Sequence, residues 1–269
     1  MPQTLNTNLI SLNAQRNLGS SQASLATSMQ RLSSGMRVNS AKDDSAGLAI
    51  AERMNAQIKG MSVAVRNAND GISLTQTAEG ALGKVGDMLQ RMRELAVQAV
   101  NSTNSTGDRD SLNNEYQQLA SESARTLGGT QFNGQSILAN TTASVFQVGA
   151  NTSSTLDQIS VAGVDWTTVG AITTAIGAAV GTAPTTAVAG TDGSFATAAI
   201  TALDAAITAV NDRRATFGAV QNRFDNVVSN LMVNVENQTA ARSRIMDADY
   251  ASETASLSRA SILQQAGNA

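Results

Sequence analysis

Few residues in this sequence could carry out chemistry, because it contains no histidine and no cysteine. Without these side chains an imidazole base, a thiolate nucleophile and the common zinc sites are all excluded. The segment GALGK at 80–84 looks like part of a phosphate-binding loop. Its spacing is wrong, however, and neither serine nor threonine follows Lys84. Glycines that allow close helix packing are the better explanation.

Asp43 and Asp44 could act as paired carboxylates. Acidic side chains are also favoured at the start of a helix, because they interact with its dipole. We therefore predict a helix start here, with no enzymatic activity, no cofactor and no metal. The alternative, from a different functional class, is an enzyme that uses a pair of carboxylates in catalysis.

One stretch carries polar side chains that suit the binding of a partner. In and just before the segment QRMREL at 90–95, Leu89 and Met92 fall on the expected core face of a helix. This leaves Arg91, Leu95 and Gln98 as a stripe at positions i, i+4 and i+7. An exposed leucine between an arginine and a glutamine indicates a contact surface, although a single exposed leucine usually has no function.

The composition limits the partners. Of the 269 residues, 42% are hydrophobic but only 3% are aromatic, so the core must consist of aliphatic side chains. With 18 basic and 21 acidic side chains, no strongly basic face is expected for nucleic acid. The N-terminus does not resemble a Sec-type signal peptide. The uncharged stretch 166–191 is too rich in threonine and glycine for a membrane span.

Helical periodicity dominates the sequence. Apolar residues recur in steps of three and four from Met54 to Ala99, which predicts one helix of about 55 residues. A capping box at 40–43 would begin it, and the run NSTNSTG at 101–107 would end it. A shorter helix with Asp108 as its N-cap would follow and stop at the glycine pair 128–129.

The period changes after this second helix. Alternating and β-branched residues within 131–161 predict a small β-hairpin region. The stretch 165–198 is rich in Ala, Thr and Gly, which indicates an exposed and variable insert. The helical pattern then returns with great regularity from Ile200 to Ile245.

Two such long helices can bury their apolar stripes only by running antiparallel. The fold class is therefore mainly α, an elongated antiparallel long-helix bundle or coiled coil with a small β-hairpin region. The predicted parts are an N-terminal segment (1–43), the first part of the long-helix domain with the β-hairpin (44–164), the insert (165–198), the returning long helix (199–246) and a C-terminal segment (247–269).

The two terminal segments are amphipathic but short of large core residues. Each would be a marginal helix by itself and needs a partner to bury its stripe. We expect these stripes to mediate assembly through Leu5, Leu9, Leu12, Leu25, Met29 and Leu32 in the first segment and Leu257, Ile262 and Leu263 in the second.

Five blocks of the sequence, in order, resemble bacterial flagellin. They are LNTNLISLNAQRNL, QRLSSGMRVNSAKDDSAGLAIAERM, LQRMRELAVQAVN, QFNGQSIL and the two-part tail FGAVQNRFDNVVSNL with RSRIMDADYASETASLSRASILQQAG. The resemblance implies a structural subunit of the flagellar filament, exported unfolded through the flagellar type III channel and assembled at the tip outside the cell. A hook–filament junction protein is the alternative, but the QRMREL and QFNG blocks favour flagellin.

The resemblance also implies partners. The chain would polymerise with itself and would bind the flagellar export chaperone and cap protein, but neither nucleic acid nor membrane. The innate immune receptor TLR5 would contact Arg91, Leu95 and Glu115, and also Gln90, Arg93 and Gln98. The family continues past QQAG for roughly five helical turns, whereas this sequence ends at GNA, which predicts weaker polymerisation and chaperone binding.

Overall fold

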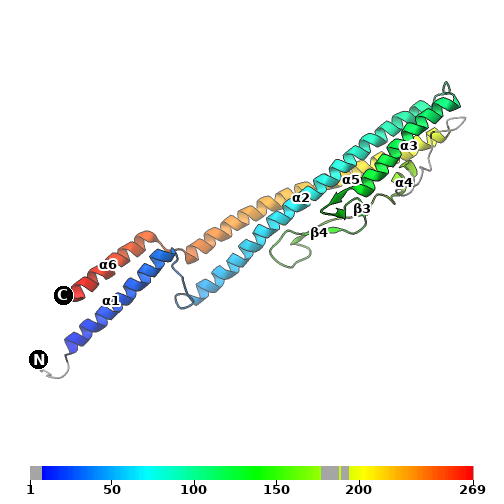
Figure 1. Ribbon diagram of the computed structural model, residues 1–269. Helices are drawn as coiled ribbons and strands as arrows, with labels where there is room; N and C mark the ends of the chain where they lie inside the picture. The colour runs from blue at the N-terminus through cyan, green and yellow to red at the C-terminus, as the bar shows by residue number, and fades with distance from the viewer. Residues whose placement is uncertain (1–7, 177–187, 189–193, 269) are drawn as a thin grey trace. The chain divides into compact units, whose positions relative to one another are not determined.

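The computed structural model describes residues 8–176, 188 and 194–268 (Figure 1). The chain forms two compact units. Unit 1 comprises Met1–Gly60 with Val233–Ala269, and unit 2 comprises Met61–Met232. The described residues are mostly helical, which confirms the predicted fold class. The helices are α1 (Leu9–Ser34), α2 (Ser45–Val100), α3 (Thr106–Gly129), α4 (Gly170–Ile176), α5 (Ser194–Met246) and α6 (Tyr250–Asn268).

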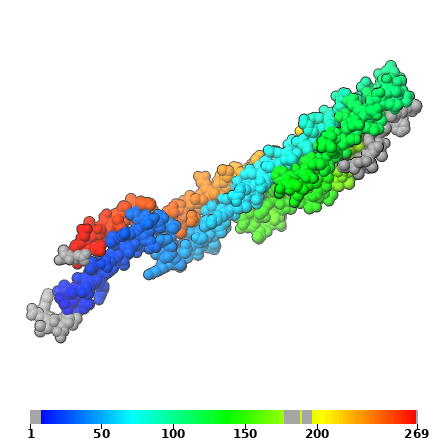
Figure 2. All heavy atoms as spheres, in the orientation of Figure 1, coloured from blue at the N-terminus to red at the C-terminus, as the bar shows by residue number. Residues whose placement is uncertain are grey.

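In unit 2, α2 and α5 run antiparallel, as the seams predict. Arg93 near the end of α2 contacts Asp204 near the start of α5, whereas Gly71 lies against Phe224 further along. The apolar seam of α2 is buried between the helices, with Leu82 and Leu89 fully inaccessible. In Figures 1 and 2, α3 and the strand region (green) lie along α2 (cyan). The core of unit 2 is therefore formed by more than two helices.

The start of α2 differs from the prediction. The helix begins at Ser45, and the Asp44 carboxylate accepts a hydrogen bond of 2.8 Å from the backbone N–H of Gly47. Asp43 instead belongs to the preceding turn, where its carboxylate accepts hydrogen bonds from the residues around Ser40. The capping box predicted at 40–43 is thus a turn, because Asp44 is one residue closer to the helix and satisfies its free N–H groups.

The start of α3 also differs by a few residues. Ser105 is the N-cap, and Asp108 lies at N3, where its side chain completes a capping box. The predicted N-cap at Asp108 was therefore wrong. Both residues take part because each satisfies an N–H of the other. The end of α3 at Gly129 agrees with the prediction.

The predicted β-hairpin region is confirmed, in three antiparallel two-stranded ladders. Asn133 and Gly134 connect the first pair with φ angles of 50° and 77°, in the left-handed region that short hairpin turns require. The pairs are β1 (Gln131–Phe132) with β2 (Gln135–Ser136), β3 (Ala139–Asn140) with β6 (Val164–Asp165), and β4 (Ser144–Gln147) with β5 (Gln158–Val161).

The insert predicted at 165–198 is not simply exposed. Trp166, Ile172 and Val188 are buried in the core of unit 2. The Tyr116 hydroxyl of α3 donates a hydrogen bond of 2.7 Å to the carbonyl of Ala175 in α4. The prediction of an exposed insert was based on the high content of Ala and Thr. It gave too little weight to the few apolar residues that hold this segment in place. The remainder of the predicted insert, 177–187 and 189–193, lies outside the described residues.

Unit 1 contains α1 and α6 as an antiparallel pair (Figure 1). The Tyr250 hydroxyl at the start of α6 donates to the carbonyl of Leu32 at 3.3 Å, and Gly267 near its end approaches Leu18. Neither α1, α6 nor any other described helix is long and apolar enough to cross a membrane. No group of three Asp or Glu side chains in the described part of the chain could hold a metal ion.

Candidate interaction surfaces

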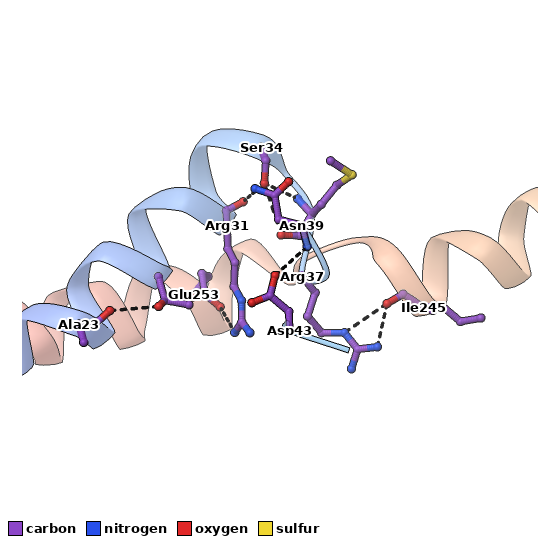
Figure 3. A network of polar contacts seen from close by, with 10 residues as sticks. Ala23, Arg31, Ser34, Arg37, Asn39, Asp43, Ile245 and Glu253 are labelled. Carbon is purple, nitrogen blue, oxygen red and sulfur yellow. Dashed lines mark hydrogen bonds and ion pairs between the residues drawn. The ribbon is translucent and has the colours of Figure 1, made fainter. Parts of the chain in front are cut away.

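A backbone junction in unit 1 holds the end of α1 against the end of α5 (Figure 3). The Arg37 backbone N–H donates to the carbonyl of Met246 at 2.6 Å, and its guanidinium donates to the carbonyl of Ile245 at 2.7 Å. Ala248 in turn donates to Gly35 at 3.0 Å. These contacts place the first residues of α6 beside the last residues of α1, and so set the pairing of the two helices.

The turn at Asp43 completes this junction (Figure 3). Its carboxylate accepts hydrogen bonds from the Ser40 backbone N–H at 2.9 Å, the Ser40 hydroxyl at 3.0 Å and the Asn39 backbone N–H at 3.1 Å. These donors hold the pKa of Asp43 below its ordinary value, and the charge of Arg31 lowers it further. The turn is thus stabilised by the ionised carboxylate.

We expect the turn to loosen in acid. Because the folded-state pKa of Asp43 is lowered, its stabilising effect is present above the unfolded pKa, about 3.9, and is lost as the pH falls through the folded value. Hydrogen exchange of the Ser40 amide, corrected for the intrinsic pH dependence, should show less protection below about pH 4. In Asp43→Asn the protection should be low at every pH. Equal protection in both chains at neutral pH would contradict this role.

The terminal stripes are divided between two environments. The side chains of Leu9, Leu12, Met29, Ile262 and Leu263 are exposed, from 48% for Leu12 to 73% for Leu9. Another three stripe residues are partly buried, namely Leu25, Leu32 and Leu257. Leu5 lies outside the described residues. The pairing of α1 with α6 therefore leaves much of the predicted assembly stripe facing solvent.

The second predicted surface is an exposed group of charged side chains, Arg91 and Glu94 of α2 and Glu115 of α3, which we call the Arg91 patch. Arg91 lies 2.9 Å from the carboxylates of both Glu94 and Glu115, so one guanidinium bridges α2 and α3. Arg93 pairs with Asp204 of α5 at 2.6 Å. These carboxylates raise the pKa values of both arginines, and the pKa of Asp204 is lowered by its hydrogen bond from Arg93. Gln90 and Gln98 are also exposed on this stretch.

Leu95 does not lie on this surface. Its side chain is only 1% exposed and belongs to the core of unit 2. The prediction of an exposed leucine was wrong because it counted one partner helix for α2. With α3 packed beside α2 as well, the buried face is wider than a single a/d seam and includes Leu95. The structure thus brings Arg91 and Glu115 together at the surface and places Leu95 beneath.

Two residues that contact the last turns of α2, Asp204 and Arg109, were not predicted from the sequence. Asp204 is 111 residues from Arg93, and no local pattern could connect them. Arg109 is 5% exposed and donates from Nε to the carbonyl of Ala99 and from a terminal nitrogen to the carbonyl of Asn101. It therefore caps the last turn of α2. A basic residue just beyond a helix end was a signal that could have indicated this cap.

Comparison with known proteins identifies the family. Residues 5–143 match the bacterial flagellin N-terminal helical region, and residues 200–269 match the bacterial flagellin C-terminal helical region. A flagellin of Halalkalibacterium halodurans is 46% identical over 266 residues, which cover 98% of this chain and 93% of that protein. A flagellin of Salmonella typhimurium is 55% identical over 157 residues, which cover 58% of this chain but only 32% of the Salmonella protein.

Solved structures agree in fold. The crystal structure of Bacillus cereus flagellin is 34% identical, with a TM-score of 0.51 over 66% of this chain and 94% of that one. A hook-associated protein from Vibrio parahaemolyticus gives a TM-score of 0.61 over 76% of this chain and all of that one, but at 13% identity it shows the fold alone. The long paired helices, the hairpin region between them and these sequence matches lead to one conclusion: the chain belongs to the bacterial flagellin family, the structural subunits of the flagellar filament.

Proposed function

We propose that this chain polymerises into an extracellular flagellar filament through the exposed faces of α1 and α6. The observation that carries the proposal is the apolar surface left open on this helix pair, with Leu9 73%, Ile262 65% and Leu263 53% exposed. A helix pair with such a surface gains free energy when a second copy covers it, at about 25 cal/mol per Å² of apolar area. Helical polymerisation supplies this cover at every subunit.

The same surface supports two further partners. Before assembly, an export chaperone would shield the apolar residues of α6 from aggregation. At the growing end, a cap protein would hold each arriving chain while α1 and α6 pair with their neighbours. Both partners, and passage through the flagellar type III export channel, form part of the proposal, since a filament outside the cell requires a route for its subunits.

Seeded assembly tests the proposal. Concentrated protein is mixed with short filament seeds and a kosmotropic salt, which favours burial of apolar surface. Sedimentation and negative-stain images should show the seeds lengthening without limit. A flagellar hook-associated protein shares this fold, and a hook–filament junction protein would add only a layer of fixed size. Such a layer, or no addition at all, would contradict the filament proposal.

We further propose that the Arg91 patch is recognised by the innate immune receptor TLR5. The patch presents a positive guanidinium held between two carboxylates, Glu94 and Glu115. Gln90, Arg93 and Gln98 are also exposed on this stretch of α2. Fixed, exposed charges of both signs suit specific recognition, because a partner must match their arrangement. Leu95 contributes by supporting α2 from within the core rather than by direct contact.

Charge changes should separate recognition from folding. We expect Arg91→Ala to raise the concentration needed for half-maximal receptor signalling in a reporter cell by at least about tenfold, as for an arginine at an interface centre. Arg125→Ala removes a similar exposed ion pair, with Glu122 on α3, and should change signalling little. The swap Arg91→Glu with Glu115→Arg keeps an ion pair but reverses the charges, and it should signal at least as weakly as Arg91→Ala. Full signalling by Arg91→Ala would disprove the contact.

A further inference from the structure

Arg213 on α5 is a half-buried cation without a carboxylate partner among the described residues. A terminal nitrogen of its guanidinium donates to the carbonyl of Ala162, between β5 and β6, and its central carbon lies 4.6 Å from the centre of the Phe217 ring. The Nε–H is buried and has no acceptor in the described part of the chain. Its neighbour Arg214, in contrast, pairs with Glu79 at 3.6 Å.

Leaving this donor unpaired is costly, because a buried polar group loses its water without gaining a partner. Burial also lowers the pKa of Arg213, since desolvation disfavours the charged form. An anion beside the guanidinium would relieve both costs. The described fold supplies stacking and one carbonyl for this arginine, but no negative charge.

Arg213 lines a small cavity between α5 and the strand region. The cavity has a volume of about 30 Å³, enough for one or two water molecules or a single carboxylate head group. Its lining combines apolar residues with amide and hydroxyl side chains, those of Gln135, Asn140, Thr142 and Ser144. All four residues can donate hydrogen bonds to an anion. A guanidinium with nearby amide and hydroxyl donors fits a planar carboxylate well.

We propose that Arg213 and the polar side chains of this cavity bind one carboxylate group, supplied in the filament by an Asp or Glu side chain of a second copy of this chain. The identity of the partner rests on the proposed function, since only assembly brings copies together. The site lies in unit 2 and is therefore distinct from the apolar stripes of α1 and α6.

Charge favours a second copy as the source. Residues 61–232 contain more acidic than basic side chains, so an open cation site on this unit is complementary to the surface of another copy. Exposed carboxylates without an ion pair in the described structure include Asp70, Asp110 and Asp225. A contact of one such side chain with Arg213 would be heterologous, with different surfaces on the two copies, as an open helical polymer requires.

A zero-length cross-link can identify the partner. The variant Arg213→Lys keeps the charge and gives an amine that a carbodiimide joins to a carboxylate in direct contact. It is assembled with an excess of the unchanged chain, so that filaments form whatever the variant alone does. We expect the introduced amine to be joined to an acidic residue of another chain in filaments and not in free subunits. The matched variant Arg214→Lys should cross-link to Glu79 of its own chain in both states.

A second variant measures the effect on assembly. Arg213→Gln should raise the protein concentration needed for seeded growth by at least about tenfold, as for the loss of one partner of an interfacial charge pair. The fluorescence of Trp166 would show that unit 2 is still folded. Filaments without a cross-link at position 213, or a cross-link only within one chain, would overturn the inference. Failure of the unchanged chain to assemble would reject the proposed function, and this partner with it.

Discussion

Replacing Phe224 with alanine is expected to lower the free energy of unfolding of unit 2 by about 3–5 kcal/mol, because it empties a fully enclosed aromatic site. The Phe224 ring is 0% exposed and meets the Phe146 ring edge-on, at 5.6 Å between centroids and an interplanar angle of 88°. It also fills the space left by Gly71 of α2, where an added Cβ would lie 2.6 Å from the ring. One side chain thus joins α5, α2 and β4.

Urea unfolding followed by the fluorescence of Trp166, the single tryptophan, would measure this effect within unit 2. Val145→Ala is a suitable control, since it truncates a residue of β4 that is 56% exposed and should cost less than about 0.5 kcal/mol. A loss below about 1 kcal/mol for Phe224→Ala would contradict the central role of the ring.

Gly71 provides a second test of this packing, because the effect of Gly71→Ala on stability should change sign when the Phe224 ring is removed. In the unchanged chain, Gly71→Ala forces a methyl group against the Phe224 ring and should destabilise unit 2 by about 1–3 kcal/mol. In Phe224→Ala the ring is gone, and the better helix propensity of alanine should stabilise by up to about 1 kcal/mol. Equal effects in both chains would show that the two residues do not interact.

The helical parts of this fold could be predicted because their signal is local. The seam of α2 repeats over many turns, and nearly all of its predicted residues in unit 2 are buried or partly buried, including Leu82, Val85 and Leu89. The turn at Asn133 and Gly134 also follows from the preferences of single residues, because both have positive φ angles.

What the sequence could not show depends on packing between distant segments. Leu95 was placed on the surface because a heptad seam describes one partner helix, and only the structure shows that α3 is a second one. The burial of Ile172 in α4 has the same origin. The pairing of Arg93 with Asp204 joins two helices that are distant in sequence, so residue types alone could not select it.

Removing the exposed apolar residues of unit 1 should abolish assembly and leave the folded chain intact. We expect Leu9→Ser combined with Ile262→Ser to raise the concentration needed for seeded growth by at least about a hundredfold. Each of these side chains, 73% and 65% exposed, would contribute about 1.5–3 kcal/mol if a second copy buried it, and about 1.4 kcal/mol corresponds to a factor of ten. Sedimentation of seeded mixtures over a range of protein concentrations would measure this threshold.

The result distinguishes assembly from folding because the changed side chains face solvent in the single chain. Circular dichroism should therefore show nearly the same helix content, since surface substitutions usually change stability by less than about 0.5 kcal/mol. Leu156→Ser is a matched control: this leucine, between β4 and β5, is 84% exposed but lies outside the helix pair. If loss of Leu156 impaired growth as strongly as loss of Leu9 and Ile262, general surface hydrophobicity would explain assembly. If only the change in α1 and α6 impairs growth, these two helices form the contact that extends the polymer.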